Sequence, residues 1–346
     1  MTNRRIFHFT IWLTVVLFGA LSALYAGDAA RIGTAAGTQL LVPVGARDLA
    51  MGGSSIATTT GVDAIFWNPS GLAGLKSTAM GTISTMQIFN DINVNYLGLG
   101  FKAGRLGVLG VSVKSIDFGD IKETTVTDPD GLSGRTFSPT FVTTGVTYAR
   151  MLTDRIQVGV NGKLIYESIP RASATAFAFD IGLQYRDLGN ISGVDFGIVV
   201  KNIGTDMKYD GSAFTTQAFE TGVSQSQFFN RIPSSDELPA KIELGVSYRN
   251  TIAENNNLMV SGVFENYNLG RDQFRFGAEY MFRDLIALRG GYILVNDAKS
   301  EDVEYKFTAG VGLHYNLNNV DFGFDYSYRD SQYFDGNNMF SLTFGF

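Results

Sequence analysis

Hydrophobic and polar positions alternate along most of the chain after residue 76. Between Val320 and Tyr328, even-numbered positions carry Val, Phe or Tyr, and odd-numbered positions carry Asp, Gly or Ser. Successive side chains of a strand point to opposite faces, so this pattern predicts a strand with one apolar and one polar face. About fourteen such runs occur. They lie near residues 77–88, 94–103, 105–118, 140–152, 156–169, 173–186, 194–203, 240–251, 257–267, 273–282, 286–296, 304–316, 320–328 and 337–346.

Two architectures fit strands of this kind, a soluble β-sandwich and a membrane β-barrel. The polar face is rich in Gly, Ser, Thr and isolated charges of both signs, which is typical of a barrel lumen. Many runs have about ten residues, the length that a tilted strand needs to cross a bilayer. Apolar faces often end in an aromatic residue, as at Tyr148, Tyr185 and Tyr315. We therefore favour an all-β fold, a 14-stranded antiparallel transmembrane β-barrel, over the sandwich.

The connections between the predicted strands alternate in length. Those after even-numbered strands are mostly short, whereas those after odd-numbered strands include two long loops, 119–139 and 204–239. Bacterial barrels have short periplasmic turns and longer outer loops, so an even strand number places both ends of the barrel on the periplasmic side. The last strand ends at Phe346, and such an ending resembles the signal that the outer-membrane assembly machinery reads. We expect this machinery and outer-membrane lipid among the partners.

Residues 1–26 have the pattern of a secretory signal peptide. Arg4 and Arg5 precede an apolar run at 11–21, and Ala26 is a suitable last residue before cleavage. A retained anchor is the alternative, but the run is shorter than the ~20 residues of a membrane-spanning helix. Cleavage would leave a chain located in the cell outer membrane.

Residues 27–76 do not alternate. They contain glycine pairs and one Asn-Pro step, so they cannot extend the wall of a barrel. Leu49, Ile56 and Trp67 are too apolar for a solvated tail. We predict an N-terminal hatch folded into the lumen, with a disordered periplasmic leader as the alternative. The chain then divides into a signal peptide (1–26), a hatch (27–76) and a barrel (77–346).

This hatch carries motifs that resemble the PorV/PorQ family of outer-membrane proteins. The hatch motif consists of Arg47, Asp48, Met51, Gly52, Gly53, Trp67, Asn68 and Pro69. Ser70 departs from the family's usual Ala after Asn-Pro. Further similarity lies at Ser115–Asp120, Tyr148–Asp154, Phe177–Gly182 and Val200–Gly204, so the resemblance covers much of 35–210.

The resemblance implies a FadL-like barrel of fourteen strands with an N-terminal segment in its lumen. It also implies a non-enzymatic role in type IX protein secretion, in which a PorV-like barrel is a partner of a large translocon barrel and carries secreted cargo. Many relatives have no assigned role. A FadL-like transporter of hydrophobic small molecules is therefore the alternative function, and a purely structural barrel is a third.

The alternation places charges of both signs on the lumen face. The predicted lumen-facing charges are Lys163, Asp180, Lys201, Glu243, Arg275, Glu279, Arg289, Asp321 and Asp325, besides Lys102 and Lys114. Three roles are open for these charges: they hold the hatch, they line a pore, or they are merely hydrated in a water-filled interior. Arg47 and Asp48 of the hatch are natural partners for them.

The longer loop carries a phenylalanine cluster. Phe214, Phe219, Phe228 and Phe229 lie among polar residues of a loop that should face water. Apolar residues in such a place predict a partner-binding surface. The alternative is a loop packed on its own barrel rim.

The amino-acid composition argues against most kinds of catalytic, metal-binding and nucleic-acid-binding site. The chain has no Cys and two His, His8 and His314, so we expect no thiol nucleophile, metal site or cofactor. It has 27 basic and 33 acidic residues, a balance that argues against nucleic acid as a partner. Gly98–Ala103 fits a loose dinucleotide pattern, but another strand follows instead of the required helix. With no G-x-S-x-G motif either, we expect no catalytic residues and no enzyme.

Overall fold

The computed structural model describes residues 29–89, 92–219, 226–317 and 320–346. Within these residues, fourteen long strands form the wall of a barrel. They are β1 (Ala79–Gln87), β2 (Asn93–Lys102), β3 (Val108–Asp117), β6 (Thr140–Met151), β7 (Ile156–Ile169), β8 (Ala172–Tyr185), β9 (Val194–Gly204), β14 (Lys241–Ala253), β15 (Asn256–Tyr267), β16 (Gln273–Phe282), β17 (Ile286–Val295), β18 (Phe307–Leu317), β19 (Val320–Arg329) and β20 (Asn337–Gly345). The expected signal peptide lies outside the described residues.

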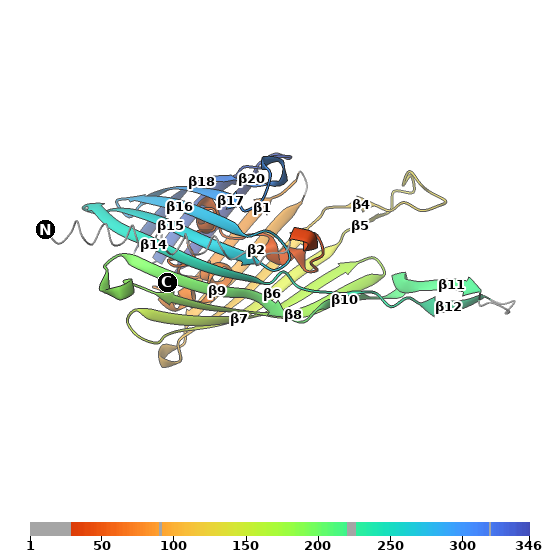
Figure 1. Cartoon of the computed structure of the whole chain (residues 1–346), viewed down its shortest axis with the longest axis horizontal. Coiled ribbons are helices and arrows are strands. Elements are labelled where there is room, and N and C mark those ends of the chain that lie inside the picture. The colour runs from red at the N-terminus through yellow and green to blue at the C-terminus, as the bar shows by residue number, and fades with distance from the viewer. Residues whose placement is uncertain (1–28, 90–91, 220–225, 318–319) are drawn as a thin grey trace.

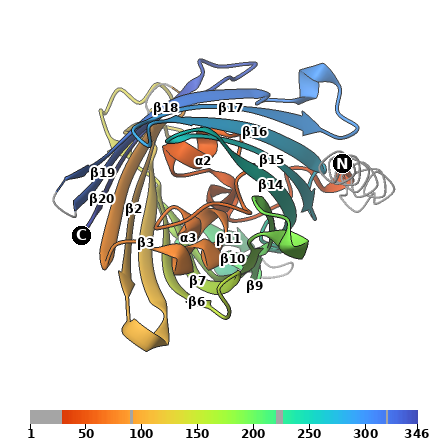
Figure 2. The ribbon, with the colours of Figure 1, turned by 90° about the vertical axis from the view of Figure 1, so that its left-hand side faces the viewer.

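The wall is a closed antiparallel ring (Figure 2). Each strand pairs with its neighbours in the chain, and β1 pairs with β20 from Met80↔Gly345 to Gln87↔Asn338. Closure leaves no free strand edge in the wall, which is the condition for crossing a bilayer with strands. The predicted 14-stranded antiparallel barrel is confirmed. Among the described residues, no helix is long and apolar enough to span a membrane.

The outer face of the wall is apolar and the inner face is polar. On β19, Phe322 and Phe324 are 52% and 39% exposed, whereas Asp325 between the strand's apolar positions is buried at 3%. Neighbouring strands expose Leu313 and Leu342 in the same way. A soluble sandwich would bury these apolar residues, so the pattern fits a wall that faces lipid.

The connections differ in length at the two ends of the barrel. The end that holds Ala79 and Phe346 has short turns, such as Arg283–Leu285 between β16 and β17. At the other end, which we call the loop end, two long connections project as arms (Figure 1). Both contain strands that the sequence pattern missed, because strands of two to five residues are too short to show alternation. These are β4 (Ile121–Lys122) and β5 (Thr136–Phe137) in the first arm, and β10 (Met207–Asp210), β11 (Thr215–Phe219), β12 (Ser226–Asn230) and β13 (Ser235–Asp236) in the second.

A bulge interrupts the pairing of β8 with β9. The register shifts between Phe179 and Ile181, so that Lys201 and Asn202 lie opposite Asp180. Asn202 adopts φ 60°, a left-handed conformation that Asn tolerates better than most residues. A bulge bends its strand and re-aims side chains. Here it brings Asn202 to the lumen side next to Lys201, so that both lie beside Asp180.

We call residues 29–76 the inner segment; Figure 2 shows its helices α2 and α3 inside the ring, whereas Ile32 near its start is 54% exposed. Helix α2 packs against β17, β18, β19 and β20, and η3 packs against β6, β7 and β8. The helices of this segment are η1 (Ala29–Arg31), η2 (Thr38–Leu41), α2 (Ala46–Ala50), α3 (Ala64–Trp67) and η3 (Pro69–Gly74); those of the connections are η4 (Gly104–Leu106), η5 (Leu188–Asn190), η6 (Ser212–Phe214) and η7 (Ser300–Asp302). The domain boundaries at 26 and 76 stay predictions.

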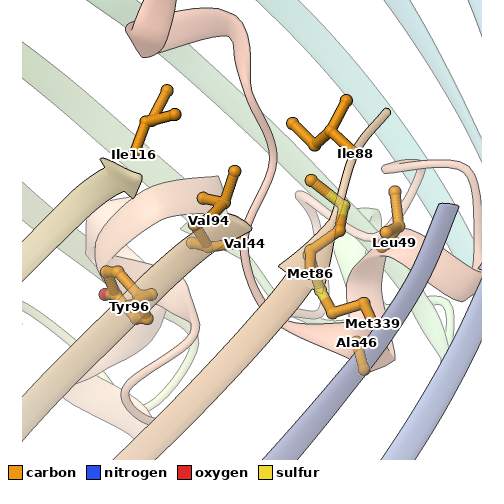
Figure 3. Packing of buried hydrophobic residues seen from close by; sticks show 9 residues of the cluster. All are labelled: Val44, Ala46, Leu49, Met86, Ile88, Val94, Tyr96, Ile116 and Met339. Atoms are coloured by element: carbon orange, nitrogen blue, oxygen red, sulfur yellow. The ribbon is translucent and has the colours of Figure 1, made fainter. Parts of the chain in front are cut away.

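Apolar side chains of the inner segment pack on the wall. Val44, Ala46 and Leu49 form a cluster with Met86 of β1 and Met339 of β20 (Figure 3). Burial of one such aliphatic side chain stabilises a fold by ~1.5–3 kcal/mol.

Glycines in the wall allow this close packing. A Cβ at Gly182 would lie 1.9 Å from Asn68 Oδ1, and a Cβ at Gly159 would lie 2.4 Å from the backbone of Pro69. The inner segment therefore lies directly against the backbone of β7 and β8.

We expect Phe324→Arg to destabilise the folded barrel, because it places a charge on the lipid-facing wall. The cost should be ~2–4 kcal/mol if residue 324 lies near the bilayer midplane. Urea unfolding in lipid vesicles measures it, with Phe324→Leu as the apolar control. An equal stability of both variants would show that this face does not contact lipid.

Candidate functional site

The Asp48 part of the hatch motif is a buried turn. Asp48 accepts hydrogen bonds from the hydroxyls of Ser55 and Thr59, and its backbone carbonyl accepts one from Gly53 N at 2.9 Å. Gly52 and Gly53 adopt φ of 65° and 72°, which favours glycine. Met51 next to them is completely buried. These contacts fix residues 48–59 as one compact unit.

The Trp-Asn-Pro part connects this unit to the wall. Asn68 Nδ2 donates to the carbonyls of Ile56 at 2.8 Å and Leu183 at 3.3 Å, and Asn68 Oδ1 accepts from Ser70. Trp67 Nε1 donates to Val44 O at 2.9 Å. Pro69 is the first residue of η3, where its missing N–H has no helical partner to lose.

A first charge network joins the inner segment to the wall, and we call it the anchor network. Arg47 makes two hydrogen bonds of 3.2 Å to the Glu279 carboxylate. Arg289, whose side chain is fully buried, binds Glu279 at 2.5 Å and Asp325 at 2.6 Å. His314 Nε2 lies 3.1 Å from Asp325 Oδ1. The Arg47 guanidinium thus ties α2 to β16, and through Arg289 to β17 and β19.

A second charge network lies elsewhere in the lumen, and we call it the lysine network. Its ion pairs are Lys163–Asp180 at 2.6 Å, Lys201–Glu243 at 3.3 Å, Arg275–Glu243 at 2.9 Å, Arg275–Glu265 at 3.2 Å and Lys241–Glu265 at 3.1 Å. Sequence reasoning missed Lys241 and Glu265. The alternation does indicate that these two side chains face the lumen. Lys241 lies two residues from Glu243 on one strand, and Glu265 lies four residues from Ser261 on the next, so each pair faces the same side.

The structure separates Asp321 from both networks. Its carboxylate accepts hydrogen bonds from Ser77 at 2.8 Å and Asn316 at 2.5 Å. These residues lie at the end of the barrel that holds Phe346. Lys102 also lies at this end, where its amine donates to Lys76 O. The remaining predicted lumen charges, apart from Lys114, divide between the two networks.

Lys114 lies where the lysine network meets the inner segment. Its amine donates to the carbonyls of Gln39 at 2.7 Å and Val42 at 3.0 Å, and it lies 4.9 Å from the centroid of the Phe66 ring. Lys201 Nζ lies 5.2 Å from the centroid of the same ring. The Phe66 ring is therefore close to two lysine amines.

A cavity of about 710 Å³ lies between the inner segment and the wall. Its inner part is lined by Phe66, Lys114, Lys163 and Lys201, and it extends to the loop end at Tyr305. This volume is within the ~300–1,000 Å³ that is usual for ligand pockets.

The two arms expose apolar side chains. Phe228 and Phe229 of β12 are 76% and 42% exposed, and Phe214 is partly buried. Phe219 pairs with Ser226 through its backbone; its side chain lies outside the described residues. In the first arm, Val126 is fully exposed.

Asp128 orders the tip of the first arm. Its carboxylate accepts hydrogen bonds from the backbone N–H of Leu132 and of Ser133, both at 2.8 Å. Hydrogen bonds to its carboxylate hold the pKa of Asp128 below its ordinary value. Those from Ser133 contribute most, and that from Leu132 contributes next. Within the described residues, no group of three or more His, Cys, Asp or Glu side chains is placed to hold a metal ion.

Residues 26–236 match the family described as type IX secretion system protein PorV, which is more than half of the 346-residue chain. The chain belongs to the PorV family. The match includes the inner segment, both arms and the strands that carry Lys114, Lys163 and Lys201. No curated protein matches the sequence.

Solved structures show the same fold. The CymD monoaromatic hydrocarbon channel is 15% identical over 88% of this chain and 97% of its own, with a TM-score of 0.52. The toluene transporter TodX of Pseudomonas putida is 12% identical over 87% and 97%, with a TM-score of 0.53. The toluene transporter TbuX of Ralstonia pickettii is 13% identical over the same shares, with a TM-score of 0.50. Family and fold together make this chain an outer-membrane barrel protein.

We expect Arg47→Met to loosen α2 without unfolding the barrel, because Glu279 keeps its bond to Arg289. Loss of the charged hydrogen bonds should cost roughly 1.5–3 kcal/mol. Hydrogen exchange of residues 46–53 should then be about tenfold faster or more. Arg31→Met is the control, since the Arg31–Glu237 pair is exposed and should be worth ~0–1 kcal/mol. Equal exchange in both variants would contradict an anchoring role for Arg47.

Acid should loosen the tip of the first arm. A lowered pKa of Asp128 means that its contribution to order is present above the ordinary pKa and is lost as the pH falls through the lowered value. Protection of the Leu132 and Ser133 amides should therefore stay constant from pH 7 down to about pH 4 and fall as the pH is lowered further. Asp128→Asn should remove this protection already at pH 7. Protection factors from hydrogen exchange measure both effects, and pH-independent protection in the unaltered chain would refute them.

Proposed function

We propose that this barrel is a non-enzymatic component of protein secretion that binds protein partners at its loop end and along its outer wall. The partners would be a translocon barrel and secreted cargo. The observation that carries the proposal is the PorV family match over residues 26–236, whose family description is a type IX secretion protein. The two arms lie within this match.

The arms support a protein partner on physical grounds. The second arm extends beyond the barrel wall as the β11–β12 ribbon (Figure 1). An isolated two-stranded ribbon is only marginally stable in water. Exposed aromatic side chains such as Phe228 are typical anchors of protein interfaces. A partner that covers Phe228 and Phe229 would stabilise the ribbon and remove their apolar surface from water.

The predicted site residues fit this role in different ways. We assign the hatch motif and the anchor network to holding the inner segment in place. We assign the phenylalanines of the second arm to partner contact. No residue is assigned to catalysis.

A second candidate function is transport of hydrophobic small molecules. The similar structures are named as a hydrocarbon channel and toluene transporters, and this barrel contains a cavity of about 710 Å³. The two functions differ in what the arms and the cavity contribute, so one set of variants separates them.

Removal of the exposed rings should reduce partner capture. The full chain with an affinity tag is extracted in detergent from its own outer membrane, and co-purified proteins are quantified by mass spectrometry. We expect a large outer-membrane barrel and secreted proteins to co-purify, and capture to fall at least roughly tenfold in Phe228→Ser/Phe229→Ser, as for loss of interface anchors. Deletion of residues 212–230 should give the same loss with the barrel still folded.

Gln227→Ala, on the same strand, is the matched control and should leave capture unchanged. If capture persists in the ring variants while toluene uptake is lost when the cavity is altered, the secretion role is wrong and the transport role replaces it.

A further inference from the structure

Two exposed arginines lie at the edge of the outer wall, at the end of the barrel that has short turns. Arg105 is part of η4, between β2 and β3, and Arg150 lies next to the last residue of β6. Val146 and Tyr148 of β6 are 64% and 43% exposed on the outer face, so Arg150 also points outward. Neither arginine forms an ion pair within the described part of the chain. Two guanidinium groups are therefore available to an external anion.

The η4 turn is held against β6, which brings the two arginines to neighbouring positions. Tyr148 Oη donates a hydrogen bond to Leu106 O at 2.7 Å. A Cβ at Gly107 would lie 2.5 Å from Ala149 O and 3.4 Å from Arg150 Cβ. The backbone of the turn therefore touches β6 beside Arg150, and the position of the turn relative to that strand is fixed.

The surroundings of the arginines are suited to a phospholipid headgroup. The strand ends of a transmembrane barrel lie at the level of the headgroups. Leu106 and Leu152, close to the arginines in the chain, are 72% and 60% exposed, so apolar and cationic surfaces adjoin here. A guanidinium group forms bidentate, charge-assisted hydrogen bonds to a phosphate. An ammonium group in the same headgroup would be repelled by the two arginines, which favours a lipid with a net negative charge.

Further along the same outer face, the wall has a pocket of about 190 Å³. Its lining includes Gly162 of β7 and the apolar side chains of Val146, Leu164, Phe177 and Phe179. These four side chains are exposed on the outer face. Gly162 faces the same side, because Leu164 lies two residues further along β7. Since glycine has no side chain, it leaves a gap among its apolar neighbours.

The pocket and the arginines are aligned along β6. Val146 pairs with Gly162 at the pocket, and Arg150 lies four residues further along the strand, which is ~13 Å. An acyl chain that begins at a headgroup beside Arg150 can follow the wall and reach the pocket. A free phosphate would contact the arginines alone, so the combination of both features specifies a lipid.

We propose that this face of the wall is a binding site for one anionic phospholipid, with its phosphate bound by Arg105 and Arg150 and one acyl chain in the Gly162 pocket. The short-turn end of a bacterial barrel faces the periplasm, so the lipid belongs to the inner leaflet of the outer membrane. The site is separate from the arms and from the lumen cavity. It therefore goes beyond the proposed secretion function and does not depend on it.

The test uses the purified full-length chain in detergent, with bound lipid counted by native mass spectrometry during titration with dipalmitoyl phosphatidylglycerol. We expect one tightly bound lipid per chain, and at least roughly tenfold weaker binding in Arg105→Gln/Arg150→Gln. Dipalmitoyl phosphatidylcholine, which carries an ammonium group, should bind the unaltered chain several-fold more weakly. Arg283→Gln is the matched control, because Arg283 is also exposed in a short turn but lies over the Phe282 ring, between β16 and β17. It should bind the lipid as the unaltered chain does.

A second variant tests the acyl chain. Gly162→Leu fills the pocket without a clash at its Cβ, which would lie 3.5 Å from Phe179 Cε1. It should weaken binding of dipalmitoyl phosphatidylglycerol several-fold and leave that of dihexanoyl phosphatidylglycerol unchanged, because the shorter chains do not reach the pocket. Heat-modifiable migration in gels checks that each variant is folded.

Equal binding of phosphatidylglycerol and phosphatidylcholine to the unaltered chain would overturn the proposal, and this comparison needs no variant. Unchanged binding by the double arginine variant would also overturn it, as would an equal effect of Gly162→Leu on both chain lengths. Displacement of the lipid by millimolar inorganic phosphate would assign the arginines to free phosphate instead.

Discussion

The fourteen wall strands must close into a ring before this chain can cross a bilayer. A strand inside a bilayer has no water to satisfy its N–H and C=O groups, so every wall strand needs two neighbours. The pairing of β1 with β20 supplies the last ladder, and the bulge opposite Asp180 keeps β8 and β9 paired while β9 bends. Beyond the bulge, β10 continues the pairing with β8 and extends it toward the second arm.

A ring of this size encloses a volume that its own side chains do not fill. The inner segment occupies much of that volume, and two different forces hold it there. Apolar packing around Leu49 and Met339 supplies burial, and the anchor network around Glu279 fixes orientation. The space that remains is the cavity beside Lys114. The polar lumen is therefore largely a binding surface for the chain's own N-terminal part.

The alternation of apolar and polar residues was sufficient to predict the wall, because in a lipid-facing barrel each strand must follow it. It also predicts Lys163, Lys201 and Glu243 on the lumen side. Which charges pair could not be predicted, since pairing depends on strand register and on the bulge at Asp180. The strands β4, β5 and β10–β13 could not be predicted, because they are too short to show an alternating pattern. The cavity depends on how the inner segment folds, and no periodic pattern encodes that fold.

A cross-link can show whether the inner segment lies inside the ring. Ser54 Oγ of the inner segment lies 2.6 Å from Ser261 Oγ on β15, and the natural chain has no cysteine. Ser54→Cys/Ser261→Cys should form a disulfide in the intact outer membrane, seen as a reducible shift in gel mobility. Ser54→Cys with Ser84→Cys on β1, far around the ring, should not. Absence of the first cross-link, or equal formation of both, would show that residues 48–59 do not lie against β15 inside the ring.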